Sequence, residues 1–118
     1  MKFIYEYKMK CVRLSNQNGR LIAQVFIANT PWLRLRGLLG RPSLNNDQAM
    51  LISPCYSVHT IGMRYSLDIV YLNSQNQVLR IKKNLKPFRA SACKGAAKVL
   101  ELAAGGIKNK NINIGDIL

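Results

Sequence analysis

A series of short apolar runs, each bounded by residues that favour turns, constrains this chain more than any other feature. Residues 21–28 (LIAQVFIA), 49–53 (AMLIS) and 66–73 (SLDIVYLN) have the length and the β-branched content of strands. The run at 78–83 (VLRIKK) follows the third of these after a polar SQNQ segment, which predicts a β-hairpin. No run approaches the ~20 apolar residues that a membrane-spanning helix needs. The chain is therefore expected to fold as a set of short strands.

One segment carries helix signals instead. Thr30 is placed to cap a helix, and Pro31 suits the first helical position. Apolar residues follow at helical spacing, and Gly40 or Pro42 is expected to end the helix. Arginines interrupt the apolar residues, so one side of this helix is expected to face solvent or a partner.

The remaining segments complete the predicted architecture. Residues 10–28 suggest a second hairpin around SNQNG, 97–105 fits either a strand or a helix, and 112–118 alternates like a closing strand. Roughly six or seven short strands with one or two short helices predict an α+β fold, compact and β-rich, with a barrel-like curled sheet. Residues 1–9 are expected to form a flexible arm, and residues 10–118 a single domain.

The chain is strongly basic. It has 18 Lys and Arg against 5 Asp and Glu, a net charge of +13. A positive surface attracts nucleic acid, anionic membranes and acidic protein surfaces. The basic residues are spread from Lys2 to Lys110, however, with no zinc-finger spacing and no RNA-binding aromatic string. Charge alone therefore predicts non-specific association with nucleic acid or an anionic membrane.

The N-terminus and the cysteines bear on location. The first ten residues, MKFIYEYKMK, contain Glu6 and lack both a sustained apolar centre and a small-residue cleavage site, unlike a signal peptide. The three cysteines, Cys11, Cys55 and Cys93, are odd in number and far apart, which favours reduced thiols over a disulfide scaffold. A cytoplasmic location is expected for the chain as given.

The single histidine, His59, lies four residues after Cys55. On one strand they would be ~13 Å apart, at ~3.3 Å per residue, too far for one metal ion or one proton transfer. A zinc site from the three cysteines and His59 would lack the short Cys spacing of structural zinc sites. A Cys–His catalytic pair would need a third, orienting group that the sequence does not name. We favour His59 as a partly buried strand residue and Cys55 as a packing residue, with no metal and no cofactor.

The other candidate functional residues are the few carboxylates and one pair of arginines. Asp68 and Glu101 each lie among apolar residues, where a carboxylate needs a partner or changes its pKa. They pair structurally with arginines or backbone N–H groups, or one of them lines a polar pocket near Arg34, Arg36 and His59. Arg34 and Arg36 could bind a carboxylate or phosphate, or form a solvated basic face.

Several motifs together carry a family likeness. RLRGLLGR, HTIGMRYSLDIVYLN, KPFRA, KVLELAAGGI and INIGDIL, in this order, resemble the bacterial and archaeal family called domain of unknown function 192, over about residues 21–118. The resemblance implies a compact β-rich α+β fold with a short Arg-Gly helix, no established reaction, and some exported or membrane-tethered relatives. HTIGMRYS marks a subgroup variant. The recurrent positions that this chain matches are Arg36, Gly37, Leu38, Met63, Leu67, Asp68, Leu100, Glu101, Gly105, Gly115 and Asp116.

These observations lead to one preferred function and two alternatives. The preferred function is a monomeric, non-enzymatic module that binds a small anionic ligand or an acidic protein surface in a cleft between the helix and residues 59–68. One alternative is a hydrolase that uses His59 with Asp68 or Glu101. The other is non-specific association with nucleic acid or an anionic membrane. The candidate ligand-binding residues are Arg34, Arg36, His59, Met63, Asp68 and Glu101.

Overall fold

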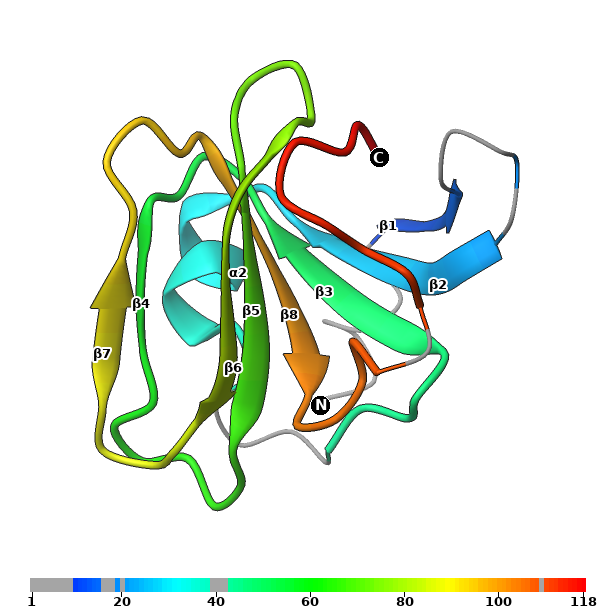
Figure 1. The fold of residues 1–118 in the computed structure, drawn as a ribbon. Helices are drawn as coiled ribbons and strands as arrows, with labels where there is room; N and C mark the ends of the chain where they lie inside the picture. Colours follow the sequence, from blue (N-terminus) through cyan, green and yellow to red (C-terminus); the bar gives the residue numbers. More distant parts are fainter. Residues whose placement is uncertain (1–9, 16–18, 20, 39–42, 109) are drawn as a thin grey trace.

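A computed structural model of the chain describes residues 10–15, 19, 21–38, 43–108 and 110–118. Its main element is a six-stranded sheet in the order β1-β2-β3-β8-β5-β6 (Figure 1). These strands are β1 (Lys10–Ser15), β2 (Leu21–Ala28), β3 (Gln48–Ile52), β8 (Lys98–Ala103), β5 (Leu67–Leu72) and β6 (Val78–Leu85). Neighbouring strands are antiparallel except β2 and β3, which are parallel.

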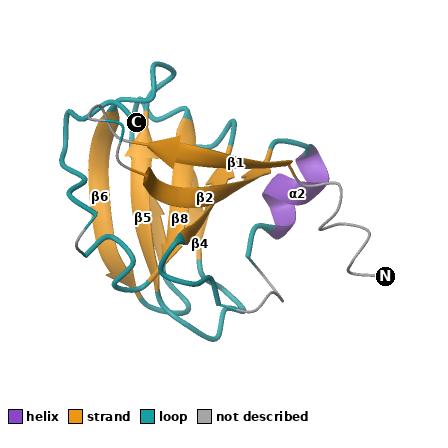
Figure 2. Ribbon diagram, turned by 90° about the vertical axis from the view of Figure 1, so that its right-hand side faces the viewer, coloured by secondary structure: helices purple, strands orange, loops and turns teal. Residues whose placement is uncertain are grey.

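Two smaller elements lie beside the sheet. The strands β4 (Ser57–His59) and β7 (Ala90–Ala92) form a separate antiparallel ribbon, and α2 (Pro31–Arg36) is a six-residue helix. In Figure 1, β4 lies between β7 and α2 on one side of the molecule. Figure 2 shows the curvature of the sheet from the side. In the described part of the chain, no helix is long and apolar enough to cross a membrane.

The strand predictions agree closely with the structure. Both hairpins are confirmed, as β1–β2 and β5–β6. The ambiguous segment 97–105 forms β8, which lies between β3 and β5 and pairs with both. This segment is a strand because it lies inside the sheet, where its backbone forms hydrogen bonds with both β3 and β5. The predicted closing strand at 112–118 is wrong, since no strand forms there, although an isolated bridge joins Gln77 to Ile117 and backbone hydrogen bonds join the segment to Val78 at the start of β6.

The helix begins as predicted and ends sooner. Thr30 caps it and its side chain accepts a hydrogen bond from the Leu33 amide at 3.2 Å. The helix ends at Arg36, because Gly37 takes φ 51° and its amide bonds to the Leu33 carbonyl. The predicted end points, Gly40 and Pro42, lie outside the described residues.

The β-rich character of the predicted fold is confirmed, but the barrel-like form is wrong. The sheet is open, with β1 and β6 as its two edges. Closure would require these edges to pair, and instead other segments cover the sheet. The α part of the predicted α+β class is not confirmed, because α2 is the only helix among the residues that the structure describes.

Both faces of the central strands are covered. Every residue of β5 is buried, and its side chains alternate between two apolar clusters. One cluster, on what we call the helix face, joins Leu67, Ile69 and Tyr71 to Leu33 of α2 and Val58 of β4. The other, on the tail face, joins Val70 and Leu72 of β5 and Leu100 of β8 to the C-terminal segment through Ile107 and Ile112.

Candidate functional site

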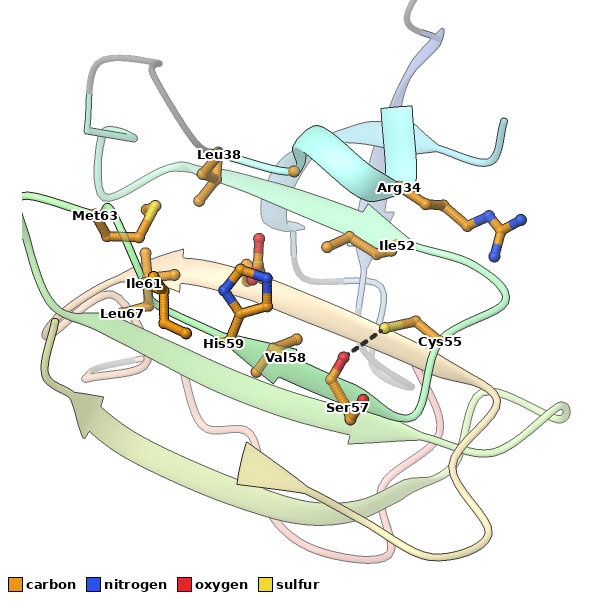
Figure 3. Close-up of a pocket in the computed structure, with 12 residues that line it drawn as sticks. Arg34, Leu38, Ile52, Cys55, Ser57, Val58, His59, Ile61, Met63 and Leu67 are labelled. Atoms are coloured by element: carbon orange, nitrogen blue, oxygen red, sulfur yellow. Dashed lines mark hydrogen bonds between the residues drawn. The ribbon is translucent and has the colours of Figure 1, made fainter. Parts of the chain in front are cut away.

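A small cavity of about 90 Å³ lies on the helix face between α2 and β4 (Figure 3). Its wall combines α2 and the turn after it with the end of β3, the segment from β4 to β5, and β8. The residues that line it are Arg34, Gly37, Leu38, Ile52, Cys55, Ser57, Val58, His59, Ile61, Met63, Leu67 and Glu101.

The two ends of the cavity differ in polarity. In Figure 3, Arg34, Cys55 and Ser57 lie toward one end, while Leu38 and Met63 lie toward the other. The ring of His59 lies between these ends. The cavity can therefore accept a molecule with a polar group and a short apolar part.

Glu101 is the most unusual group in the wall. Its side chain is only 4% exposed, and its Oε1 has no hydrogen-bond partner among the described residues. Burial raises its pKa from 4.5 to about 7. Gly37 leaves open the space beside this oxygen, since a Cβ atom there would lie 3.7 Å from Oε1. Glu101 is thus a buried carboxyl group with hydrogen-bonding capacity left over.

Arg34 brings a cation to the same cavity. Its Nη1 donates to the Pro54 carbonyl at 3.3 Å. Its Nε is buried and has no hydrogen-bond partner within the described part of the chain. An unpaired buried donor is costly, so this N–H is available to an acceptor on a ligand.

Cys55 packs against the helix-face cluster, as expected from the sequence, and it also lines the cavity. It precedes β4 rather than lying on it, so the strand spacing used to separate it from His59 does not apply. Its Sγ donates to the Ser57 carbonyl at 3.0 Å. Burial, partly offset by that hydrogen bond, raises the thiol pKa; the charge of Glu101 also raises it and the charge of Arg34 lowers it. The thiol therefore lies within the electrostatic influence of both groups.

The other predicted residues divide into three groups. His59 is exposed and Met63 is buried, and both line the cavity. The side chain of Arg36 lies outside what the structure describes. Asp68 does not line the cavity.

Asp68 instead binds backbone on another part of the molecule. Its carboxylate accepts from the amides of Asn84 at 2.8 Å, Gly105 at 3.0 Å and Ile107 at 3.3 Å. These bonds tie β5 to the end of β6 and to the turn after β8. They supply a structural role for Asp68, through backbone amides, one of the two kinds of partner considered from the sequence.

Sequence reasoning missed several wall residues. Gly37 carried a signal, as a recurrent position beside the helix, and Cys55 was noticed for its spacing to the histidine. Ser57 and Ile61 carried none, because neither residue type is distinctive in a strand or turn. Within the described ranges, no group of three His, Cys, Asp or Glu residues is placed to hold a metal ion.

Two solved structures are similar to this one. One is a protein from Sinorhizobium meliloti that is described as a proposed transcription regulator. It matches with a TM-score of 0.78 and 26% sequence identity, and the match covers 92% of this chain and 91% of that protein. A protein of unknown function from Novosphingobium aromaticivorans also has a TM-score of 0.78, with 22% identity over 92% of this chain and 83% of its own. The second likeness shows the fold alone.

Comparison of sequences gives the family. A UPF0127 protein of Thermococcus sibiricus is 33% identical over 98 residues, 79% of this chain. The chain spans 63% of the length of that curated relative. Residues 12–118 match DUF192, described as "Uncharacterized ACR". The resemblance drawn from the motifs is confirmed, and the chain belongs to the DUF192 family.

Proposed function

We propose that this protein is a small-ligand-binding module, and that its cavity takes a short aliphatic carboxylic acid bearing a hydroxyl or amino group. The observation that carries the proposal is the unpartnered Oε1 of Glu101 in the cavity wall. Native proteins satisfy nearly all buried polar groups, so each exception needs an explanation. A ligand that donates a hydrogen bond to this oxygen supplies one.

The polar groups of the wall define the ligand. Arg34 offers an N–H donor and a positive charge, which suit a carboxylate. Glu101 offers an acceptor, which suits a hydroxyl or an ammonium group. The apolar end, with Leu38 and Met63, suits a short aliphatic part (Figure 3). A cavity of about 90 Å³ restricts the inserted group to a small one.

A titration followed by amide NMR tests the proposal, with lactate, alanine and propanoate as probes. Propanoate lacks the hydrogen-bond donor for Glu101. We expect lactate or alanine to shift the amide signals of the cavity wall, and to bind about tenfold more tightly than propanoate. Glu101→Leu, which removes the acceptor, should abolish that preference, whereas Arg34→Gln should weaken binding of all three acids.

Arg64→Gln is the matched control, because Arg64 is exposed and does not line the cavity. It should leave every affinity unchanged. The proposal fails if none of the three acids shifts the cavity signals, or if Arg64→Gln weakens binding as much as Arg34→Gln.

An acid–base enzyme is a second candidate, and the raised pKa of Glu101 favours it. A carboxyl group with a pKa of about 7 can both give and take a proton near neutral pH. His59 lines the same cavity. If the protein converts a ligand, Glu101→Gln should abolish turnover, and the pH–rate profile of the wild type should have an inflection near 7. If a ligand binds without being converted, the protein acts as a binding module and not as an enzyme.

A further inference from the structure

The turn at residues 86–89 presents a large apolar side chain to solvent. Phe88 is 67% exposed, and Ile61 in the neighbouring loop is 60% exposed. The two loops are joined, because the amide of Phe88 donates to the carbonyl of Thr60, the residue before Ile61. In Figure 1 the two loops lie at the same end of the β4–β7 ribbon. We call Ile61 with residues 86–89 the tip.

The backbone of Phe88 is strained as well. Its φ is 60°, a region that residues with large side chains avoid. Within the described part of the chain, the other non-glycine residues with positive φ are Asn76, Asn84 and Asn111, and asparagine tolerates this region. Phe88 therefore combines an unfavourable backbone conformation with an exposed ring.

Thr60 holds the turn in this conformation. This residue is fully buried, and its hydroxyl donates to the Lys86 carbonyl at 2.6 Å and accepts from the Arg89 amide at 2.9 Å. Its backbone amide donates to the Arg89 carbonyl at 2.8 Å. Strain that the surrounding structure fixes so firmly is typical of functional segments. Nothing within the described chain covers the exposed ring, so its apolar surface is left for a partner.

The charges around the tip indicate the partner. Lys86 and Arg89 belong to the tip, and Arg64 follows in the same loop as Ile61; all three are exposed. Residues 59–66 and 86–91 contain no Asp or Glu. Two apolar side chains among cations suit a surface with an apolar interior and anionic head groups. A single-stranded nucleic acid fits less well, because its bases stack on aromatic rings and Ile61 offers none.

We infer that the tip docks onto an anionic lipid bilayer, with Phe88 and Ile61 entering the interface and Lys86, Arg89 and Arg64 contacting the head groups. Ile61 also lines the cavity, so docking would bring the cavity wall to the membrane surface. This inference does not depend on which ligand the cavity takes.

Sedimentation with phosphatidylcholine vesicles, with and without phosphatidylglycerol, tests the inference with the full chain. The main variant is Phe88→Asn, which removes the ring and suits positive φ, so its melting temperature should stay the same or rise. We expect binding only to vesicles with phosphatidylglycerol, and about tenfold weaker partitioning for Phe88→Asn. Tyr56→Asn is the matched control, because Tyr56 is 64% exposed and lies at the opposite end of β4.

A second pair of variants tests the role of charge. Lys86→Gln should weaken partitioning about fivefold at low salt. Lys94→Gln removes the same charge from an exposed residue just beyond the opposite end of β7, and should have a smaller effect. Equal losses for Lys86→Gln and Lys94→Gln would mean that overall charge, and not the tip, attracts the bilayer.

Three further results would overturn the inference. One is no sedimentation with anionic vesicles at low salt, and another is unchanged partitioning of Phe88→Asn. The third is that Phe88→Asn weakens binding of a labelled single-stranded oligonucleotide while the wild type ignores vesicles, which would make the tip a nucleic-acid surface.

Discussion

Asp68 on β5 and Glu101 on β8 face opposite sides of the sheet, although their strands are neighbours. Glu101 pairs with Ile69, and Asp68 pairs with Leu102. Because successive side chains on a strand point to opposite faces, this offset of one residue puts Glu101 on the helix face and Asp68 on the other. Of the two carboxylates suggested as partners of His59, only Glu101 lines the cavity with it.

Glu101 should make the folded protein less stable as the pH rises from 4.5 to about 7. In this range the carboxyl group ionises in the unfolded chain, while burial keeps it protonated in the folded one. The folded state then binds more protons, so the free energy of unfolding falls with pH, by about 3 kcal/mol in total. Above the folded-state pKa the loss of stability is complete, and the contribution of Glu101 to the free energy of unfolding no longer changes with pH.

Glu101→Gln isolates this effect, because a neutral amide does not ionise. Urea unfolding of both proteins at several pH values gives the difference in stability. We expect the stability of the variant relative to the wild type to rise steadily between pH 4.5 and about 7. A difference that is independent of pH would show that Glu101 titrates normally.

Asp68→Asn should destabilise the fold by about 2 kcal/mol, because an amide cannot accept all three backbone hydrogen bonds. Asp116→Asn is a suitable comparison, since the Asp116 side chain accepts from one backbone amide, that of Asn113 at 2.8 Å. It should cost roughly 0.5–1 kcal/mol. Equal midpoints in urea for the two variants would argue against the structural role of Asp68.

Gly37→Ala should affect both stability and the cavity. Its φ of 51° and ψ of −127° lie in a region that residues with a Cβ atom avoid, so alanine should cost about 1–3 kcal/mol. The new methyl group would also stand beside Glu101 Oε1 and weaken lactate binding. Gly95→Ala also puts a Cβ atom at a positive φ, 88°, but lies outside the cavity wall, so this variant should lose stability alone. Equal lactate affinities in the two variants would place the ligand elsewhere.

Alkylation of the cysteines provides a probe of the cavity. The raised pKa and partial burial of Cys55 should make it react with iodoacetamide about tenfold more slowly than the exposed Cys11 near neutral pH. Lactate at saturating concentration should slow the reaction at Cys55 and leave that at Cys11 unchanged. Peptide mass spectrometry measures both rates. Equal protection of the two thiols would indicate an effect of lactate on the reagent rather than on the cavity.

Much of the fold could be predicted because its signals are local. The apolar runs gave β2, β3 and β5, turn residues gave the two hairpins, and Thr30 with Pro31 gave the start of the helix. The errors concern pairing between distant segments. Alternation at 112–118 predicted a strand, but the segment packs Ile112 into the tail-face cluster and bonds to Val78 at the start of β6 without forming a strand. Local sequence signals also could not predict whether the sheet closes, because closure depends on whether the two edge strands meet.

The candidate site shows the same division. Sequence by itself identified the family, the scarcity of carboxylates, and Arg34, His59, Met63 and Glu101 as residues of interest. Only the tertiary structure decided which of them share a cavity and that Glu101 is almost fully buried. Composition records which groups are present, but burial, pKa and unsatisfied hydrogen bonds depend on strand register and on what covers each face of the sheet.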